Sequence, residues 1–323
     1  MKKSQYTRLV LSLFLLNVCA PYAQSYPTKS IRLIVPLAAG GNVDIVARAI
    51  AQPMAEALGQ TVIVDNRPSA SSLVGTQMVA KAPADGYTIL AIANTFATVP
   101  SVMPNPGYDP IKDFAGVSLT CLVPQLLVSN PSLPVRNVKE LIALAKRKPG
   151  ELAWSTSGTA GTGHMAGELF SRQAGMKLLH VPYKGNAPAL IDVIAGQVQL
   201  MFDQVSTSQP YVLSGKLRPL GVTSLTRSAL FPQVPTIDES GLKGFEDITF
   251  NGLVVPIATP RDIKLRIQSE VVRIVHTKDL HQRFLERGIE LASSASPEAF
   301  GDYVVAEFDK KGKLAREAGI KMD

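Results

Sequence analysis

Short apolar runs alternate with amphipathic helical patterns along most of the chain. Runs rich in Val, Ile and Leu, such as 31–37 and 198–203, are typical of buried strands. In 44–58 the apolar residues recur every three or four positions, which predicts a helix with one buried face. Pro53 interrupts this pattern, so we expect a kink or a break there. The alternation favours parallel sheets with helices on both faces, an α/β fold.

The remaining predicted elements continue this alternation. We expect further strands at 61–64, 87–93, 152–156, 178–183 and 217–223, and helices at 138–147, 163–174, 188–195, from 260 to about 276, and from 297 onward. In doubly wound sheets a ligand lies beyond the carboxyl ends of the strands. The segments that follow the predicted strands are therefore the first places to look for function.

The first 25 residues have the composition of a secretory signal peptide. Basic residues precede an apolar core at 9–18, and mostly small residues follow it up to Ser25. A membrane-spanning helix needs about 20 apolar residues, so this core is too short to be one. We expect cleavage before Tyr26 and export to the periplasm, with lipid attachment at Cys19 as the alternative.

Charge and cysteine content exclude several classes of protein. The formal net charge is +7, and removal of 1–25 would leave 30 basic against 26 acidic residues. The basic residues are scattered rather than gathered in a stripe with aromatics, so we expect no nucleic-acid partner. Only Cys121 remains after cleavage, which excludes an internal disulfide. Four histidines without a Cys/His cluster predict neither a metal site nor a cofactor.

The first predicted strand leads into a glycine-containing turn at 36–44. Gly40 and Gly41 allow a sharp turn and close approach of a ligand, and the helix that follows offers unpaired N–H groups. No Lys or Arg lies between Ala39 and Asn42, so any attraction for an anion must come from the backbone. An ordinary strand-to-helix turn capped by Asn42 remains an alternative.

A second segment of the same kind is 155–164. It holds five hydroxyl residues, three glycines and no acidic residue, and it also joins a predicted strand to a predicted helix. A carboxylate would find backbone amides and hydroxyl donors here. A flexible polar loop without function is the alternative.

Two enzymatic interpretations involve the same segment. The stretch 161–166 fits the loose Gly-x-Gly-x-x-Ala form of a dinucleotide fingerprint, which is a weak signal by itself. Ser157 or its neighbour Ser155 could act as a nucleophile, and His164 with Asp203 would then complete a hydrolase triad. No Gly-x-Ser-x-Gly elbow is present to expose such a nucleophile. The sequence therefore favours a binding protein over an enzyme.

A series of short motifs runs in order from Tyr26 to the end of the chain. They include Tyr26-Pro27, Val35-Pro36, Gly40-Gly41, Asp65-Asn66-Arg67-Pro68, Asp85-Gly86-Tyr87, Tyr108-Asp109-Pro110, His180-Val181-Pro182-Tyr183, Met201-Phe202-Asp203, Gly215-Lys216-Leu217 and Val234-Pro235-Thr236. This set and order resembles the Bug-type receptors, the periplasmic solute-binding components of tripartite tricarboxylate transporters.

The resemblance implies a two-lobed periplasmic binding protein fold, with two doubly wound sheets joined by a hinge. The first lobe would comprise 26–123 and 246–323, and the second, inserted lobe 124–245. A small carboxylate would bind in the cleft between the lobes of a monomer and pass to integral-membrane transporter subunits. A receptor that reports its ligand to a membrane signalling partner is the alternative, and a secreted hydrolase is a more distant one.

The resemblance also implies ligand-binding residues in both loops. The first lobe would contribute Ala39, Gly40, Gly41, Asn42 and Asp44, and the second Ser157, Gly158, Thr159 and His164, with Asp203 at the edge of the cleft. Two segments depart from the family pattern. Leu37-Ala38-Ala39 stands where Phe-Pro-Pro is usual, and Ser69-Ala70-Ser71-Ser72 replaces Gly-Ala-Gly-Gly. We expect the second departure to narrow the cleft or to add donors to it.

Overall fold

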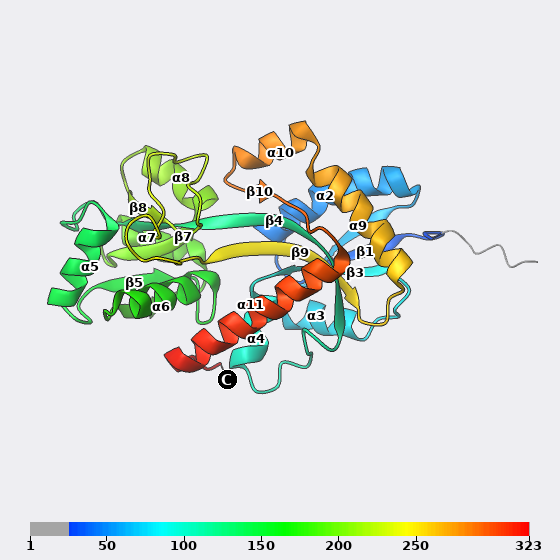
Figure 1. Ribbon diagram of the computed structural model, residues 1–323, viewed down its shortest axis with the longest axis horizontal. Helices are drawn as coiled ribbons and strands as arrows, with labels where there is room; N and C mark the ends of the chain where they lie inside the picture. The colour runs from blue at the N-terminus through cyan, green and yellow to red at the C-terminus, as the bar shows by residue number, and fades with distance from the viewer. Residues whose placement is uncertain (1–25, 323) are drawn as a thin grey trace, which may run out of the picture.

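The computed structural model describes residues 26–322, so the predicted signal peptide and its alternative at Cys19 lie outside the described residues. In the described part, strands and helices form two groups joined by two long strands, β4 (Phe114–Ser129) and β9 (Ile248–Pro256). Figure 1 shows these two strands side by side through the middle of the molecule, where they pair antiparallel. The chain therefore leaves and re-enters the first group along neighbouring paths.

The first group builds its sheet in the order β2–β1–β3–β9–β4. β1 (Ile31–Val35) is parallel to both β2 (Val62–Asn66) and β3 (Thr88–Ala93), and the short β10 (Glu290–Leu291) adds to β4. The helical elements of this group are α2 (Asn42–Leu58), η1 (Ala70–Ser72), α3 (Leu73–Ala80), α4 (Thr95–Val102), α9 (Arg261–Val275), α10 (Lys278–Leu285) and α11 (Pro297–Ala318).

The second group continues the sheet from β4 in the order β7–β5–β6, with β8 also pairing with β4. Its strands are β5 (Ala153–Thr156), β6 (Leu179–Pro182), β7 (Leu200–Gln204) and β8 (Arg218–Val222). Its helices are α5 (Val138–Arg147), α6 (Thr162–Ala174), α7 (Asn186–Ile194) and α8 (Val205–Leu213). Each group has apolar clusters of its own, for example around Ile31 and Phe250 in the first and around Trp154 and Phe231 in the second.

The predicted α/β class is confirmed, and two details differ from the expectation: the sheets are not purely parallel, and α2 has no break at Pro53. The sheets are mixed and join through β4 into one ten-stranded sheet of the described residues, because the outgoing and returning strands must run in opposite directions. α2 also continues through Pro53 as one helix. Burial of Val46, Ile50 and Met54 along one face of α2 outweighs the one backbone hydrogen bond that proline cannot make.

The two groups meet at a hinge formed by Gln125, Thr223 and Asp247. β4 pairs with β9 as far as Pro124 and with β7 and β8 from Gln125 onward. Gln125 and Thr223 hold each other through two hydrogen bonds of 2.9 Å, and Asp247 N–H donates to Thr223 O at 3.1 Å. We propose lobe limits of 26–123 with 246–323 and 124–245, and this change of pairing partner is the observation that supports them.

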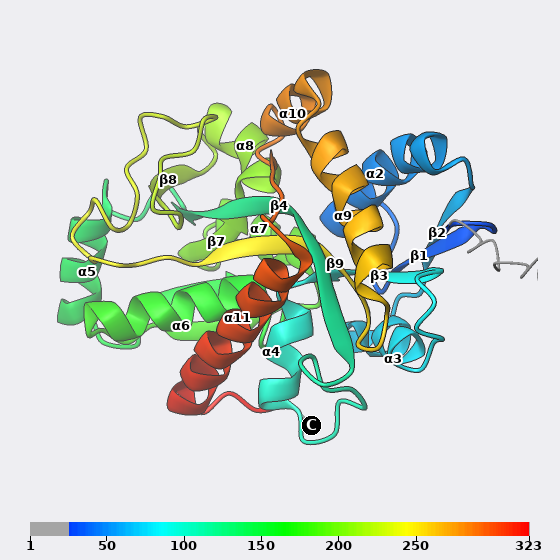
Figure 2. The same ribbon diagram turned by 45° about the vertical axis from the view of Figure 1, so that its right-hand side comes forward.

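The C-terminal helix α11 reaches from the first lobe to the second. Its buried Lys311 forms an ion pair with the hinge residue Asp247. Farther along, Leu314 packs with Ala160 and Met165 beside α6, and Figure 2 shows the end of α11 next to α6 and α4. We call this apolar packing the α11–α6 contact. An exposed ion pair between Arg172 and Glu317 at 2.9 Å borders it. α11 thus ties the hinge and both lobes together.

Candidate functional site

A cavity of about 490 Å³ lies between the two lobes. From the first lobe, the start of α2 and the turn after α10 line this cavity. From the second lobe, the starts of α6, α7 and α8 line it. The hinge contributes Gln125 of β4. The lining residues are Gly40, Gly41, Asn42, Ile45, Gln125, Ser157, Thr162, Gly163, Asn186, Phe202, Asp203, Gln204, Ser206, Thr207, Gln209, Arg287 and Ile289. Four helix starts therefore converge on one space.

The loop before α2 is held from behind by Asp44. Gly40 adopts a left-handed angle (φ 83°), and its N–H donates to Asp44 Oδ2 at 2.9 Å. Asp44 is 3% exposed and also accepts hydrogen bonds from Arg48 and Asn66. The cap residue Gly41 is extended (φ −77°) and makes no side-chain cap bond, so the first N–H groups of α2 remain open toward the cavity.

The environment of Asp44 keeps its carboxylate ionised. Burial alone would raise the pKa of Asp44, but the hydrogen bonds from Arg48, Gly40 N–H and Asn66 outweigh burial and lower the pKa below its usual value. The charge is matched by the Arg48 guanidinium, with Nε 3.0 Å from Asp44 Oδ1. Asp44 therefore supports the loop and does not line the cavity.

The loop before α6 repeats this backbone arrangement with a different support. Ala160 has a left-handed angle (φ 60°), and its N–H donates to His164 Nδ1 at 3.0 Å. Gly161 is extended (φ −69°) and, like Gly41, makes no side-chain cap bond. Since His164 Nδ1 accepts a hydrogen bond, the ring proton of neutral His164 lies on Nε2, which is 3.7 Å from Glu168 Oε1.

His164 belongs to a buried aromatic stack. Its ring lies 3.9 Å from the ring of His180, nearly parallel to it, and Trp154 packs on His180 at 4.9 Å. His180 Nε2 is 2.7 Å from Thr156 Oγ1. Burial, reinforced by the neighbouring His164, lowers the pKa of His180 to about 4. The second loop therefore rests on a ring stack in which His180 is uncharged at neutral pH.

Asp203 lines the cavity at the end of β7, but its oxygens already accept hydrogen bonds. The Thr207 and Ser208 hydroxyls donate to Oδ2 at 2.6 Å, and Asn186 Nδ2 donates to Oδ1 at 2.7 Å. Burial raises the pKa of Asp203, and these hydrogen bonds only partly oppose it. Asp203 thus fastens the starts of α7 and α8 to the sheet.

The structure divides the predicted site residues into three sets. Lining the cavity are Gly40, Gly41, Asn42, Ser157 and Asp203. Asp44 and His164 lie behind their loops and hold them. The residues Ala39, Gly158 and Thr159 are not among those that line the cavity, and of these Gly158 has a positive backbone angle (φ 142°).

Sequence reasoning missed several lining residues. Thr162 and Gly163 belong to the second polar loop, so that signal was present. Gln125 comes from a strand, Asn186 from another helix start and Arg287 from the turn after α10, and no local pattern marks them. At Gly163 a Cβ would lie 2.7 Å from Phe202 O. This glycine therefore allows α6 to pack closely on β7, which explains the stretch that resembles a dinucleotide fingerprint.

The segment Ser69-Ala70-Ser71-Ser72 forms a turn before α3. Ser69, Ser71 and Ser72 are not among the residues that line the cavity. Ser71 and Ser72 keep left-handed angles of 55° and 63°, which glycine adopts more easily. Ser69 Oγ accepts a hydrogen bond from Val74 N–H and stabilises the local turn. An effect of this segment on the width of the cleft stays a prediction.

The hypothetical hydrolase triad is not assembled. His164 Nδ1 accepts from Ala160 N–H, and Asp203 accepts from Asn186, Thr207 and Ser208 rather than from a histidine. Ser155 Oγ donates to Ala189 O at 3.2 Å inside the core. Within residues 26–322, no cluster of three or more His, Cys, Asp or Glu residues could hold a metal ion, and no helix has the length and apolar character to cross a membrane.

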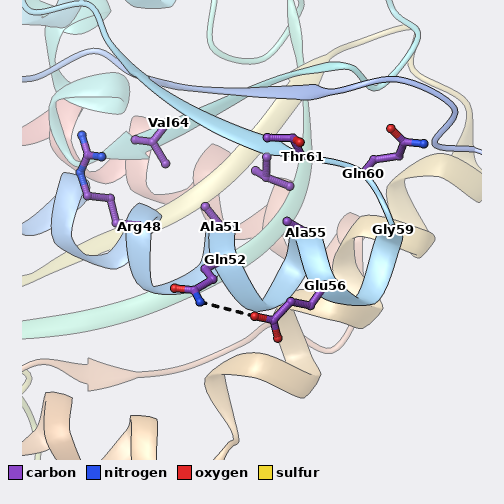
Figure 3. Close-up of a pocket in the computed structure, with 10 residues that line it drawn as sticks. Arg48, Ala51, Gln52, Ala55, Glu56, Gly59, Gln60, Thr61 and Val64 are labelled. Carbon is purple, nitrogen blue, oxygen red and sulfur yellow. Dashed lines mark hydrogen bonds between the residues drawn. The ribbon is translucent and has the colours of Figure 1, made fainter.

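A larger hollow of about 650 Å³ lies elsewhere on the first lobe. It is lined only by α2, β2 and the segment that joins them, with Gln52 Nε2 donating to Glu56 Oε1 at 3.4 Å across its rim (Figure 3). It receives nothing from the second lobe and contains no helix start. The interlobe cavity is therefore the better candidate for function.

Comparison with known proteins gives a consistent result. The family model of the tripartite tricarboxylate transporter family receptor matches residues 46–320. Protein BugT of Bordetella pertussis is 32% identical over 323 residues, covering 98% of this chain and 99% of BugT. The solved structure of Rpa4515 from R. palustris with adipate has a TM-score of 0.80 at 35% identity, covering 92% of this chain and 99% of that one. MatC from Rhodopseudomonas palustris with bound malate has a TM-score of 0.76 at 28% identity, covering 90% and 99%.

Proposed function

Because the chain belongs to the receptor family of tripartite tricarboxylate transporters, whose members are solute-binding proteins and not enzymes, we propose that it captures a small carboxylate in the periplasm and delivers it to membrane transporter subunits. The ligand binds in the interlobe cavity. Relatives with adipate and with malate in their solved structures support a carboxylate as the ligand class.

The observation that carries the proposal is the meeting of two uncapped helix starts at one cavity. The starts of α2 and α6 present N–H groups without side-chain cap bonds, and each helix dipole adds partial positive charge there. Ser157 and Thr162, which carry hydroxyl groups, line the same space. Such a set of neutral donors suits a carboxylate without requiring a salt bridge.

The binding residues have separate tasks in this proposal. Gly41 and Asn42 present backbone N–H groups from the first lobe, and Ser157 and Thr162 add donors from the second. Asp44 and His164 hold the loops that carry these donors. Asp203 positions the starts of α7 and α8 and lies at the edge of the ligand. The remaining residues Ala39, Gly158 and Thr159 give the loops their shape.

Binding closes the lobes about the hinge. A ligand that contacts both lobes binds the closed arrangement better than the open one, and only this difference shifts the population. A nearly complete shift requires about 5 kcal/mol of differential binding. The membrane subunits then recognise the closed form.

Isothermal calorimetry with succinate, malate and adipate tests the proposal, with Gly41→Ala and Gly41→Val as variants. A Cβ at Gly41 meets only Ala38 O at 3.6 Å, and the backbone angle is ordinary, so Gly41→Ala should fold normally. The melting temperature of Gly41→Val shows whether its two further methyl groups are tolerated. We expect affinity to fall with side-chain size, by on the order of tenfold or more for Val, because the side chain occupies ligand space. Unchanged affinity in Gly41→Val would contradict the proposed ligand site at the start of α2. A wild-type protein that binds none of the three acids would contradict the proposal that the ligand is a carboxylate.

A further inference from the structure

Gln125 is a buried donor without a partner. Its side chain is 1% exposed and lines the cavity, and its Nε2 has no hydrogen-bond partner among the described residues. Buried polar groups in native proteins are nearly always paired, because an unmade hydrogen bond costs free energy. An unpaired donor on a side chain that lines the cavity therefore points to a partner that the described residues do not supply.

The backbone of Gln125 is held in place on both sides of the residue. Its N–H donates to Thr223 Oγ1 and its carbonyl accepts from Thr223 N–H, both at 2.9 Å. Gln125 also pairs with Gln204 of β7, at the point where β4 changes its partner strands. Its Oε1 is 3.7 Å from the place where a Gly163 Cβ would lie, so the amide sits beside the start of α6.

We propose that Gln125 Nε2 donates a hydrogen bond to a carboxylate oxygen of the ligand and so couples ligand binding to the hinge. This inference rests on the proposed function. Since Gln125 lies where β4 passes from the first lobe into the second, its contact fixes the ligand beside the hinge about which the lobes rotate. The α2 and α6 starts then close onto a ligand that is already positioned.

The substitution Gln125→Met tests this proposal because methionine has a similar size and no donor. The protein without ligand should keep or raise its melting temperature, since the unpaired donor is gone. Affinity for malate and adipate should fall about tenfold by calorimetry. Gln125→Glu should bind more weakly still, because its carboxylate repels the ligand. Small-angle scattering should show that saturating ligand closes Gln125→Met less completely than the wild type.

Gln233→Met is the control for the glutamine-to-methionine change, because Gln233 is exposed and lies outside the cavity lining. It should change affinity by less than about twofold. A Gln125→Met protein that melts earlier and binds malate and adipate as the wild type does would show a structural role and overturn the inference. Failure of the wild type to bind any carboxylate would instead overturn the proposed function on which the inference rests.

A separate observation concerns charge. Arg287 is exposed and is the only cationic side chain among the residues that line the cavity, and the described residues give it no ion pair. The next residue, Gly288 (φ 71°), brings the turn against the start of α8, where an added Cβ would lie 3.2 Å from Ser206 N and 3.0 Å from Val205 Cγ1. This packing keeps Arg287 at the α8 side of the cavity, whereas Gln125 lies at the α6 side.

From this placement we infer that Arg287 selects ligands with a second anionic group. Arg287→Gln should lower the affinity for the dicarboxylates succinate and adipate by on the order of tenfold. The affinity for the monocarboxylates butanoate and hexanoate should stay unchanged. Arg283→Gln is the control, because Arg283 lies one turn earlier on α10 and outside the cavity lining and the change removes the same net charge. It should change the affinity for none of the four acids. Equal losses of affinity for mono- and dicarboxylates in Arg287→Gln would overturn the inferred role of Arg287. The same losses of affinity in Arg283→Gln would overturn it as well.

Discussion

The loops before α2 and α6 share a backbone design but differ in the chemistry that supports it. Gly40 and Ala160 occupy equivalent left-handed positions, and each donates its N–H to the side chain four residues later. That side chain is a carboxylate in the first lobe, paired with Arg48. In the second lobe it is an imidazole within a ring stack, and its Nδ1 is the acceptor.

The difference shows that the loops need one hydrogen-bond acceptor at a fixed place and not a particular charge. Both supports are buried behind their loops, so neither brings a formal charge into the cavity. The backbone N–H groups consequently remain the main attraction for an anion in both lobes. The two supports should nevertheless respond differently to substitution and to acid.

Asp44→Asn should have the largest effect. An asparagine amide group would face the donors of Arg48 and Asn66, so we expect a loss of about 2–3 kcal/mol in the free energy of unfolding. His164→Asn keeps an acceptor for Ala160 N–H and should lose only about 1 kcal/mol. Urea unfolding of the two variants measures both values, and equal losses would contradict the assigned difference between the supports.

Exchange of the two left-handed residues should have an intermediate effect. A Cβ on Gly40 meets no atom within 4 Å, so Gly40→Ala adds only backbone strain, about 1–2 kcal/mol. Ala160 already carries this strain, but its methyl group is 4% exposed and packs in the α11–α6 contact. In Ala160→Gly the relief of strain and the loss of about 0.8 kcal/mol of methyl burial should nearly cancel. Thermal unfolding of both variants checks this, and a neutral Gly40→Ala would show that the angle is not required.

Acid should have the smallest effect of these changes on stability. It acts near the second support through His180, whose ring stacks on His164 and is only partly buried. The pKa of His180 falls from 6.5 to about 4 on folding, so between these values the unfolded chain binds a proton that the folded protein does not. Stability from this group is therefore lost as the pH falls from 6.5 to 4. The pKa of Asp44 lies below 3.8, so its contribution is lost only under more acidic conditions.

The melting temperature as a function of pH, for the wild type and His180→Gln, measures the histidine contribution. The variant should lose less stability than the wild type between pH 6.5 and pH 4. Parallel curves for the two proteins would mean that His180 takes up its proton equally well in the folded state.

Local patterns were enough to predict many elements but not the strands that join the lobes. The observed α5 has the predicted bounds, and α6 begins one residue earlier than predicted, because amphipathic spacing and caps act over a few residues. β4 was not predicted as a strand. It contains Pro124, which argues against a strand interior, and polar residues such as Thr120 that are buried only because distant strands flank it.

The same limit applies to the candidate site. Glycines and hydroxyls concentrate in two short loops, so Gly41 and Ser157 could be identified from sequence and do line the cavity. Gln125 and Arg287 lie in a strand and a turn, more than 150 residues apart, and only the sheet topology and the packing of α10 bring them to one space. Their part in binding stays a proposal that rests on burial and charge.

The path of α11 has a consequence for how long a solute is retained. Because Lys311 fastens this helix to the hinge and Leu314 packs beside α6, any rotation of the second lobe must shift α6 against the end of α11. Under the proposed closure, the strength of the α11–α6 contact therefore enters the free energy of opening, and so the release of a ligand from a cavity that no α11 residue lines. Two receptors with the same cavity can differ in residence time through one apolar side chain near the C-terminus, which makes Leu314 a natural adjustment point for slow storage or rapid handover.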